Sequence, residues 1–543
     1  MSDGNADPGD GGLPPGGVGG VGPLGTAPVV PPFQPPFLAL LDRYMDSHLP
    51  IFADSDVTPL IQGTAYFPSL AAAINTLSGD ITKQFIYITG WLLDPDFSLA
   101  GVGGAPTVID LLAAKAKAGA DVCVLGWIMP PTVLPKVMAR GGDPGGMLSI
   151  NRQTMSFIDK LRKAEPNMAE KAVLNILSHP AGAVHMKMAI VGSDSQTTGF
   201  TGGMDMGAQR HWPTWHDVSV MVKGSVLQTF VEAFRLMWNE IQKRPAATVT
   251  INTLPKMPPI TMTTHSSAMG TLSARLLAGA SSKTLRTQSV RTLPKFDFPW
   301  WTSISSVLPT NDPLSYAPNG LMEVKQVWQK AISAAQTYIY IEDQGFSSSD
   351  VYDWINTVFK ASPKMRVIIV TGVKDPNDAP NNRSIAVFNS FINNNLLKGI
   401  TAQADLDRIG IFSHKTKIVH TKSTIVDDQW ALIGSANCMR RGLFTDFEHS
   451  VSFMDEAGTA VPAYRTDLWG KHLSSQIPDL NAALAAWFAN PAALARLKLP
   501  LPATPPLSAD DQIMYDEIDD ANSQNTWGNG LKTLKSKKAG SSS

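Results

Sequence analysis

The sequence repeats the same order of elements in its two halves. Residues 85–91 and 338–344 are short β-branched and aromatic runs that each follow a helical stretch, and residues 122–127 and 367–372 form a second matching pair of apolar runs. Strands that alternate with helices at this spacing are typical of parallel β/α layers. The duplication therefore predicts an α/β chain that folds as two related lobes.

A third pair of matching strand-like runs carries polar residues. Each half has one His-x-Lys motif, formed by His185 and Lys187 in the first half and by His420 and Lys422 in the second. Glycine-rich corners and further strand-like runs follow in both halves, at 202–205 and 215–220 in the first and at 434–437 and 447–452 in the second. Five matched elements in one order indicate an internal duplication rather than coincidence.

The two motifs suit chemistry at a phosphodiester. Residues two apart in a strand point to the same face, so each motif presents an imidazole beside an ammonium group. If the lobes pack about a pseudo-twofold axis, the lysines can neutralise phosphate oxygens while one imidazole attacks phosphorus and the other protonates the leaving oxygen. Histidine titrates near about 6.5, so one ring can be neutral while the other is charged. This chemistry needs no metal and no cofactor.

Further polar residues are candidates for supporting roles. Asp217 and Glu448 stand at equivalent places in the two halves and are expected to accept a hydrogen bond that sets the tautomer of a catalytic imidazole. Asn437, with Ser435, is expected to donate hydrogen bonds to phosphate oxygens. Asp205 occupies the place equivalent to Asn437, which predicts different jobs for the two half-sites.

One acidic residue is present in only one half. Asp427 follows His420 by an odd number of residues, so on a regular strand its carboxylate faces away from the histidine and lysine. We interpret it as a structural residue that ties down a turn. The first half has Gly192 at the matching place and Asp194 two residues later.

Composition excludes several classes of protein. With 45 Lys+Arg against 46 Asp+Glu, the formal net charge is −1, which argues against nucleic-acid binding through bulk electrostatics. Cys123 and Cys438 lie far apart and fit neither a metal knuckle nor a disulfide framework, so we expect two buried small hydrophobes. His211 and His216 flank aromatic residues, and we interpret them as structural histidines.

The composition also changes along the chain. The expected divisions are a disordered Gly/Pro-rich leader at 1–36, an N-terminal lobe at 37–244, a linker at 245–283, a C-terminal lobe at 284–500 and a tail at 501–543. The leader lacks the basic and apolar regions of a signal peptide, and no apolar run approaches the roughly 18 residues that span a bilayer. We therefore expect a protein that is cytoplasmic or is exported without a classical signal.

The spacing of these residues resembles that of the phospholipase D superfamily. The run His420-x-Lys422-x4-Asp427, followed by Gly434-Ser435-x-Asn437 and then Glu448, matches its signature, and the first half is similar except at Gly192. The resemblance implies two similar α/β lobes, each with a mixed, largely parallel sheet flanked by helices, in a pseudo-twofold bilobal α/β/α/β/α sandwich. It also implies one active site between the lobes and a covalent phosphohistidine intermediate. By similarity His185 is the nucleophile and His420 the general acid and base, with the reverse assignment still open.

The superfamily acts on several phosphodiesters, so the substrate must be argued separately. We predict a phospholipase D-type phosphodiesterase that hydrolyses and transphosphatidylates glycerophospholipids to phosphatidic acid or its esters, acting as a monomer. An aromatic cluster with Phe298, Trp300 and Trp301 suits peripheral contact with a membrane surface or micelle. The alternatives are a phospholipid synthase that works by phosphatidyl transfer, a nuclease or DNA-end phosphodiesterase, and a non-catalytic scaffold. A nuclease would need a basic stripe, for which the candidates are Arg286, Arg291, Arg440 and Arg441.

Overall fold

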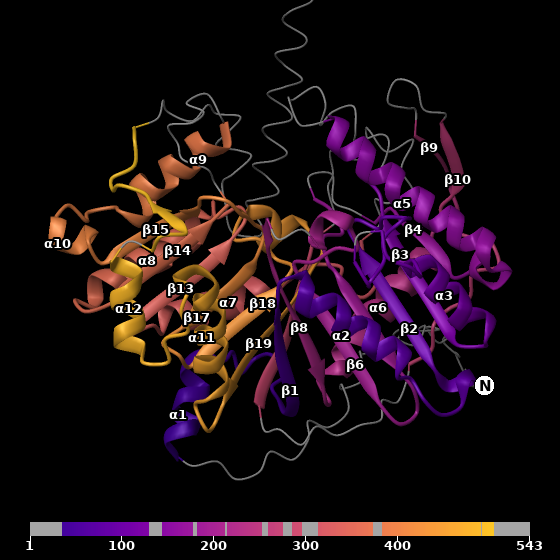
Figure 1. Ribbon diagram of the computed structural model, residues 1–543, viewed down its shortest axis with the longest axis horizontal. Helices are drawn as coiled ribbons and strands as arrows, with labels where there is room; N and C mark the ends of the chain where they lie inside the picture. The colour runs from indigo at the N-terminus through magenta and orange to yellow at the C-terminus, as the bar shows by residue number, and fades with distance from the viewer. Residues whose placement is uncertain are drawn as a thin grey trace, which may run out of the picture.

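The described part of the chain forms two α/β halves that lie side by side (Figure 1). The computed structural model describes residues 35–101, 103–129, 144–177, 182–211, 214–251, 259–274, 285–295, 313–372, 383–489 and 491–503. The aromatic cluster of Phe298, Trp300 and Trp301, most of the leader and most of the tail lie outside these ranges.

The strands of the two halves follow the same spatial order. In the N-terminal lobe the order is β1 (Phe52–Ile61), β8 (Val218–Lys223), β6 (Thr197–Gly202), β5 (Met188–Gly192), β2 (Phe85–Gly90), β3 (Asp121–Trp127) and β4 (Ala172–Asn175). In the C-terminal lobe it is β11 (Leu285–Leu293), β19 (Glu448–Asp455), β18 (Trp430–Gly434), β17 (Lys422–Val426), β13 (Tyr338–Asp343), β14 (Arg366–Thr371) and β15 (Ile409–His414). Each strand has its counterpart in the other lobe, so the predicted duplication extends to the topology.

The two sets of strands join through antiparallel pairing of β1 with β11. Parallel pairing occurs at the outer ends, between β2, β3 and β4 and between β13, β14 and β15, where helices connect successive strands. The strands between these ends pair antiparallel. A short strand, β20 (Leu494–Arg496), adds to the edge beside β15, and β12 (Leu321–Met322) pairs with β11. The predicted mixed α/β fold is confirmed.

Both faces of each sheet are buried. In β2, Ile86 and Ile88 belong to a core that also contains residues of helices α2 (Gly63–Asn75), α3 (Val108–Lys117) and α5 (Pro144–Ala164). Tyr87 faces a second core, which the two lobes share and to which helix α6 (Leu227–Lys243) contributes its apolar stripe. The alternation follows from the two-residue period of a strand. These near-continuous apolar runs are typical of strands covered on both sides.

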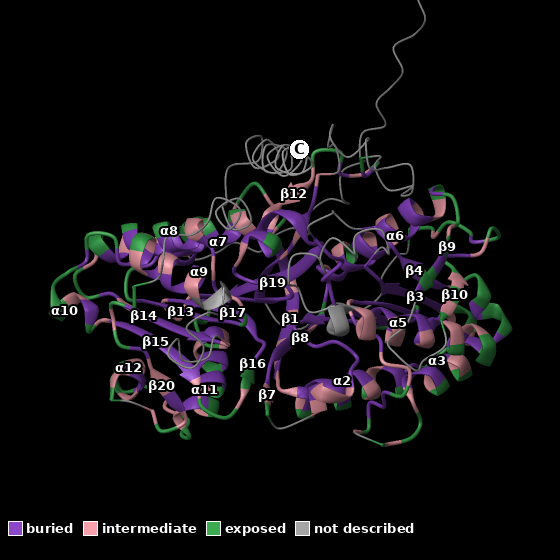
Figure 2. Ribbon diagram, turned by 90° about the horizontal axis from the view of Figure 1, so that it is seen from above, coloured by how far each residue is buried: buried purple, intermediate pink, exposed green. Residues whose placement is uncertain are grey.

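The C-terminal lobe repeats this arrangement. In β13, Ile339 and Ile341 face a core with α7 (Glu323–Ser333), α8 (Ser349–Ala361) and α9 (Arg383–Phe391), whereas Tyr338 and Tyr340 face the shared core. Helices α11 (Ala460–Leu473) and α12 (Leu480–Phe488) also pack into the shared core. Figure 2 shows buried strands in the middle of the molecule and exposed residues on the outer helix faces.

Smaller elements complete the described fold. Helix α1 (Pro35–Tyr44) packs on the core of the C-terminal lobe, although it precedes the N-terminal lobe in sequence. The segment expected as a linker, 245–283, contains the antiparallel strands β9 (Thr248–Ile251) and β10 (Ile260–Thr263). Both cysteines are buried, as expected, and they are not joined to each other by a disulfide. Among the described residues, no helix is both long enough and apolar enough to cross a bilayer.

Candidate active site

The two His-x-Lys motifs lie where the strand pattern is interrupted. His185 and Lys187 precede β5, and His420 lies between the short strand β16 (Ile418–Val419) and β17. The expectation of a motif inside a regular strand therefore needs correction. The backbone at both histidines pairs with the opposite lobe instead: His185 N donates to Phe447 O (3.0 Å) and His420 N donates to His216 O (2.8 Å).

Each histidine is held by a carboxylate from the other lobe. His185 Nδ1 donates to Glu448 Oε1 at 3.0 Å, and His420 Nδ1 donates to Asp217 Oδ2 at 2.7 Å. The carboxylates are buried, and the two imidazoles are 10% and 6% exposed. Because the pairs cross between lobes, neither half can orient its own histidine.

The contacts of His185 also determine its tautomer. Its Nδ1 lies 3.1 Å from the carbonyl oxygen of Ser435, and a carbonyl oxygen can only accept a hydrogen bond. The proton therefore sits on Nδ1, and the neutral ring carries its lone pair on Nε2. A tryptophan lies beside each ring, Trp91 near His185 and Trp215 near His420, with centroid separations of 6.0 and 5.4 Å.

The two lysines have related but unequal surroundings. Lys187 Nζ donates to the carbonyl oxygen of His185 at 2.6 Å and lies 5.7 Å from the centroid of the Trp91 ring. Lys422 Nζ donates to the carbonyl oxygen of His420 and to Gln344 Oε1 at 3.2 Å. Both ammonium groups are buried, and they lie close enough for the charge of Lys187 to lower the pKa of Lys422.

A buried carboxylate accompanies each lysine, but it comes from different places in the two lobes. In the first lobe Asp205 Oδ2 lies 3.6 Å from Lys187 Nζ, and Asp205 Oδ1 accepts from the backbone of Trp91 and Leu92. In the second lobe Asp343, at the end of β13, accepts from Cys438 N at 2.8 Å. The sequence assigned Asp205 a supporting place, but it missed Asp343.

Arg210 is a further member of the site that the sequence did not indicate. Its Nη2 donates to His420 Nε2 at 3.4 Å and lies 3.5 Å from Asp205 Oδ2, while its guanidinium carbon is 4.1 Å from the centroid of the Trp215 ring. The residue lies in a 3₁₀ turn, Ala208–His211, and its side chain is buried. It adds a third cation to the interior, and no local motif marks it.

Burial and the neighbouring positive charges lower the pKa values of the two histidines. Burial, together with Lys187 and Lys422, holds the pKa of His185 well below its usual value, and burial with Arg210 and Lys422 does the same to the pKa of His420. These shifts favour the neutral form of both rings in the free protein, whereas the sequence analysis expected one of them to carry a charge. The same cations act on both rings because the two motifs share one interior.

The pKa values of the buried acids are raised and those of the buried lysines are lowered, so both kinds of group lose their charge more easily than usual. Burial raises the pKa of Asp217 to about 7 and lowers the pKa of Lys422 to about 8. Burial and the neighbouring Asp446 raise the pKa of Glu448 well above its usual value. The raised pKa of each acid and the lowered pKa of each histidine bring the proton affinities of the two partners in each His–carboxylate pair closer together.

Ser435 and Asn437 lie close together but differ in their contacts. The Ser435 hydroxyl donates to Glu448 Oε2 and accepts from His449 N at 3.0 Å, so it holds the carboxylate in place. Asn437 is 8% exposed, and its Oδ1 has no hydrogen-bond partner within the described part of the chain. Because the Ser435 hydroxyl donates its proton to Glu448, only the side-chain amide of Asn437 stays a candidate for the expected donation to phosphate.

Asp427 points away from this site. Its carboxylate accepts from the backbone of Gln336, Thr337 and Tyr338 at 2.7, 2.7 and 2.8 Å, and from the hydroxyl of Tyr44 at 2.8 Å. It thereby fastens the turn that leads into β13.

The first lobe uses another device at the matching turn. An added Cβ at Gly192 would lie 2.4 Å from Cζ of Phe85, so this place cannot hold an aspartate without repacking. Asp194 instead forms an exposed ion pair with Lys83 at 3.1 Å.

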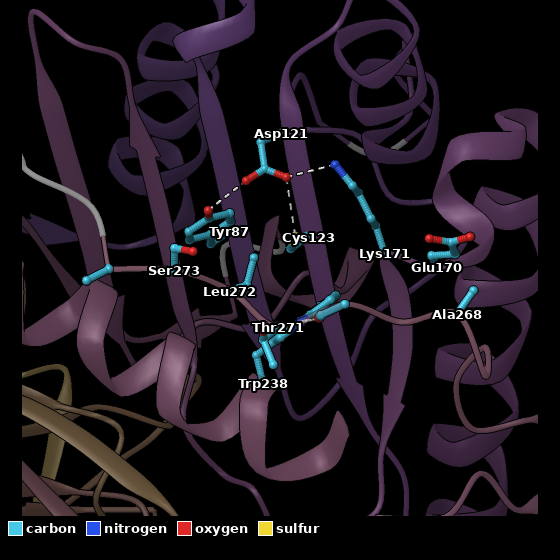
Figure 3. Close-up of a pocket in the computed structure, with 12 residues that line it drawn as sticks. Tyr87, Asp121, Cys123, Glu170, Lys171, Trp238, Ala268, Thr271, Leu272 and Ser273 are labelled. Atoms are coloured by element: carbon cyan, nitrogen blue, oxygen red, sulfur yellow. Dashed lines mark hydrogen bonds and ion pairs between the residues drawn. The ribbon is translucent and has the colours of Figure 1, made fainter. Parts of the chain in front are cut away.

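A large pocket lies elsewhere in the N-terminal lobe. It has a volume of about 510 Å³ and is lined by Tyr87, Asp121, Lys171 and Trp238 among others (Figure 3). Asp121 is already hydrogen-bonded to the Tyr87 hydroxyl and ion-paired with Lys171, both at 2.8 Å. The lining contains none of the His-x-Lys residues, so the pocket is separate from the candidate site.

Comparison with known proteins gives matches to both sequence and fold. Residues 329–467 match the family model described as cardiolipin synthase, PLD-like domain. The crystal structure of phosphatidylserine synthase from Haemophilus influenzae Rd KW20 is similar with a TM-score of 0.51 and 13% identity, over 81% of this chain and 91% of that one. Polyphosphate kinase from Porphyromonas gingivalis has a TM-score of 0.40 and 11% identity, over 80% of this chain and 55% of that one. No curated protein sequence matches the chain.

Proposed function

We propose that the chain, whose residues 329–467 match a family of PLD-like domains, is a phospholipase D-type phosphodiesterase that cleaves glycerophospholipids through a covalent phosphohistidine and passes the phosphatidyl group to water or an alcohol. The observation that carries the proposal is the pair of histidines, each oriented by a carboxylate from the opposite lobe, in one interior with two buried lysines.

The first step uses the lone pair that the structure leaves on His185 Nε2. This nitrogen attacks phosphorus, the bond from phosphorus to the headgroup oxygen breaks, and His420 delivers a proton to that oxygen as it leaves. The second step reverses the roles: His420 takes a proton from water or an alcohol, whose oxygen attacks phosphorus and releases His185. Asp217 and Glu448 hold the rings in position through both steps.

The cations supply the remaining stabilisation. Lys187, Lys422 and Arg210 surround the site with positive charge in an interior from which water is largely excluded, so they stabilise the charge that develops on the phosphoryl oxygens. The phosphodiester brings a negative charge that offsets their repulsion of an imidazolium. Substrate binding thereby favours the protonated form of His420 that the first step needs.

A phospholipid is favoured over a nucleic acid by the contacts of the candidate basic stripe. Arg286 and Arg440 are buried, Arg291 is paired with Glu323 at 3.0 Å and Arg441 with Asp446 at 3.0 Å. These arginines therefore form no exposed basic track, which binding to a phosphate backbone requires. The matching family model carries the description cardiolipin synthase, PLD-like domain, which supports a phospholipid as substrate.

The test is a transfer assay on phosphatidylcholine vesicles with a primary alcohol present. We expect phosphatidic acid and phosphatidyl-alcohol from the wild type and neither product from His420→Ala. Protein that is quenched with alkali during turnover should carry a phosphoryl group on a histidine. We expect this phosphohistidine in the wild type but not in His185→Ala.

The variants also separate the catalytic proposal from its rivals. His185→Ala and His420→Ala should leave the unfolding midpoint nearly unchanged, because both rings line the site and do not fill an apolar core. Lipid-inactive wild type that cleaves an oligonucleotide would overturn the lipid assignment. Wild type that cleaves no phosphodiester at all would favour the scaffold.

A further inference from the structure

Three buried side chains from both lobes converge behind the active site. His216 comes from the short strand β7 (Trp215–His216) of the first lobe, Glu342 from β13 and His472 from α11 of the second. His216 Nε2 lies 2.9 Å and His472 Nε2 lies 3.3 Å from the same oxygen, Glu342 Oε1. All three side chains have an exposed fraction of 0%.

These atoms lie at ion-pair distances, but their geometry is poor for hydrogen bonds. Neither Nε2 atom nor Glu342 Oε1 has a hydrogen-bond partner within the described part of the chain, because their short separations lack the required directions. Buried polar atoms without partners are costly and uncommon. Three of them gathered within 4.8 Å of one another therefore indicate something that the three atoms bind together. His216, interpreted from the sequence as a structural histidine, is thus buried without a hydrogen-bond partner for its ring within the described residues.

Their spacing fits a small divalent metal ion. The ligand atoms lie within 4.8 Å of one another, and two of the separations are 2.9 and 3.3 Å. Tetrahedral zinc with bonds of about 2.0–2.1 Å has ligand atoms roughly 3.3 Å apart. Two imidazoles with one carboxylate are a ligand set that zinc-class ions bind.

The surroundings support Glu342 and limit the ligands to three. The second carboxylate oxygen, Oε2, accepts from the Tyr340 hydroxyl at 2.9 Å, which holds the carboxylate in orientation. His414 is near, with its ring centroid 5.9 Å from that of His472, but its Nδ1 accepts from Thr416 N and Lys417 N. In the neutral ring the proton is then on Nε2, so His414 offers no lone pair to a metal.

We propose that His216, Glu342 and His472 bind one zinc-class divalent ion, with water as fourth ligand, and that this ion joins the two lobes behind the catalytic groups. Strand alternation connects it to the active site. Asp217 follows His216, Asp343 follows Glu342, and in a strand neighbouring side chains point to opposite faces. The ion would thus fix the backbone from which Asp217 reaches His420. Figure 2 shows β7 and β16 side by side at this junction of the lobes.

The experiment measures metal binding directly and uses protein purified without a metal-affinity column. The protein is stripped with a chelator, dialysed and titrated with zinc chloride against a chromophoric competitor. We expect one zinc ion per chain, and His472→Gln should weaken zinc binding by at least about 100-fold, since even the loss of an outer partner costs 10–100-fold. His414→Gln is the matched control, a neighbouring histidine that should leave zinc affinity unchanged.

Two further readouts do not depend on the variant folding well. Cobalt chloride added to the stripped wild type should give the intense visible bands of a four-coordinate ion, and zinc should raise the unfolding midpoint of the wild type. Wild type that binds no zinc above background and shows no such cobalt bands would overturn the proposal. So would equal loss of zinc binding in His414→Gln and His472→Gln. None of these readouts depends on the substrate.

Discussion

Replacing Asp427 separates a structural role from a catalytic one for the acidic residue of the His-x-Lys signature. The Asp427 carboxylate accepts three backbone N–H groups and the Tyr44 hydroxyl, and none of its contacts is with His420 or Lys422. We expect Asp427→Ala to lower the free energy of unfolding while leaving the rate of lipid cleavage per folded molecule nearly unchanged.

The size of the effect follows from the exposure of these four hydrogen bonds. The bonds from Gln336 N and Thr337 N are exposed, so water can replace them, whereas those from Tyr338 N and the Tyr44 hydroxyl are partly buried. Losing the two partly buried bonds costs about 1–1.5 kcal/mol each. Asp427 also has a φ of 56°, and placing alanine in this left-handed region adds about 1 kcal/mol.

The total is about 3–4 kcal/mol, which for a lobe of this size lowers the unfolding midpoint by about 6–16 °C. The assay pairs thermal unfolding with initial rates measured well below the midpoint of the variant. Asp427→Asn, which keeps one acceptor oxygen and tolerates the positive φ, should lose less stability than Asp427→Ala. His420→Ala should show the opposite pattern, with activity lost and the midpoint retained. An Asp427→Ala protein of normal stability with a 100-fold lower rate would refute this reasoning.

Three other predictions follow from single contacts. Glu448→Gln should reduce kcat by about 100-fold or more with little change in KM, because His185 loses the carboxylate that orients its ring; equal loss in binding and turnover would contradict this. Gly192→Ala should lower the unfolding midpoint, because the new Cβ meets the Phe85 ring at 2.4 Å; an unchanged midpoint in thermal unfolding would disprove the clash. Burial, with a smaller contribution from a nearby arginine, lowers the pKa of His449 to about 3. Between about pH 6.5 and 3 the unfolded chain therefore binds a proton at this residue more readily than the folded chain does. As the pH falls through that window, the free energy of unfolding should fall by up to about 1.4 kcal/mol per pH unit. Urea unfolding at several pH values should show a shallower fall in His449→Gln than in the wild type, and identical slopes would contradict the assignment.

The fold could be predicted from the sequence because its signals are local and occur twice. The apolar runs around Tyr87 and Tyr340 have the length and period of strands buried on both faces, and the structure places both in the shared core. The order of the strands within each sheet could not be obtained in this way. Strands β1 and β11 pair although they are far apart in the chain, and the sequence of one strand does not identify the other as its partner.

For the candidate site too, the residues could be recognised from the sequence but the contacts between them could not. The spacing of His185 with Lys187 and of His420 with Lys422 is short enough to be recognised in the sequence, and so are Asp217 and Glu448 as acceptors. Their assignment to particular histidines was not recognisable. His420 and Asp217 are 203 residues apart and His185 and Glu448 are 263 apart, because each pair crosses between the lobes.

The sequence by itself therefore determined the duplication, the two α/β lobes and the chemical groups of the candidate site, since these depend on local periodicity and spacing. Only the tertiary structure decided which groups act on one another. It brought Arg210 to His420 and placed Glu342 between His216 and His472. The physical reason is that burial and electrostatic coupling depend on distances in space, which packing of the two lobes sets and which no single segment of the chain encodes.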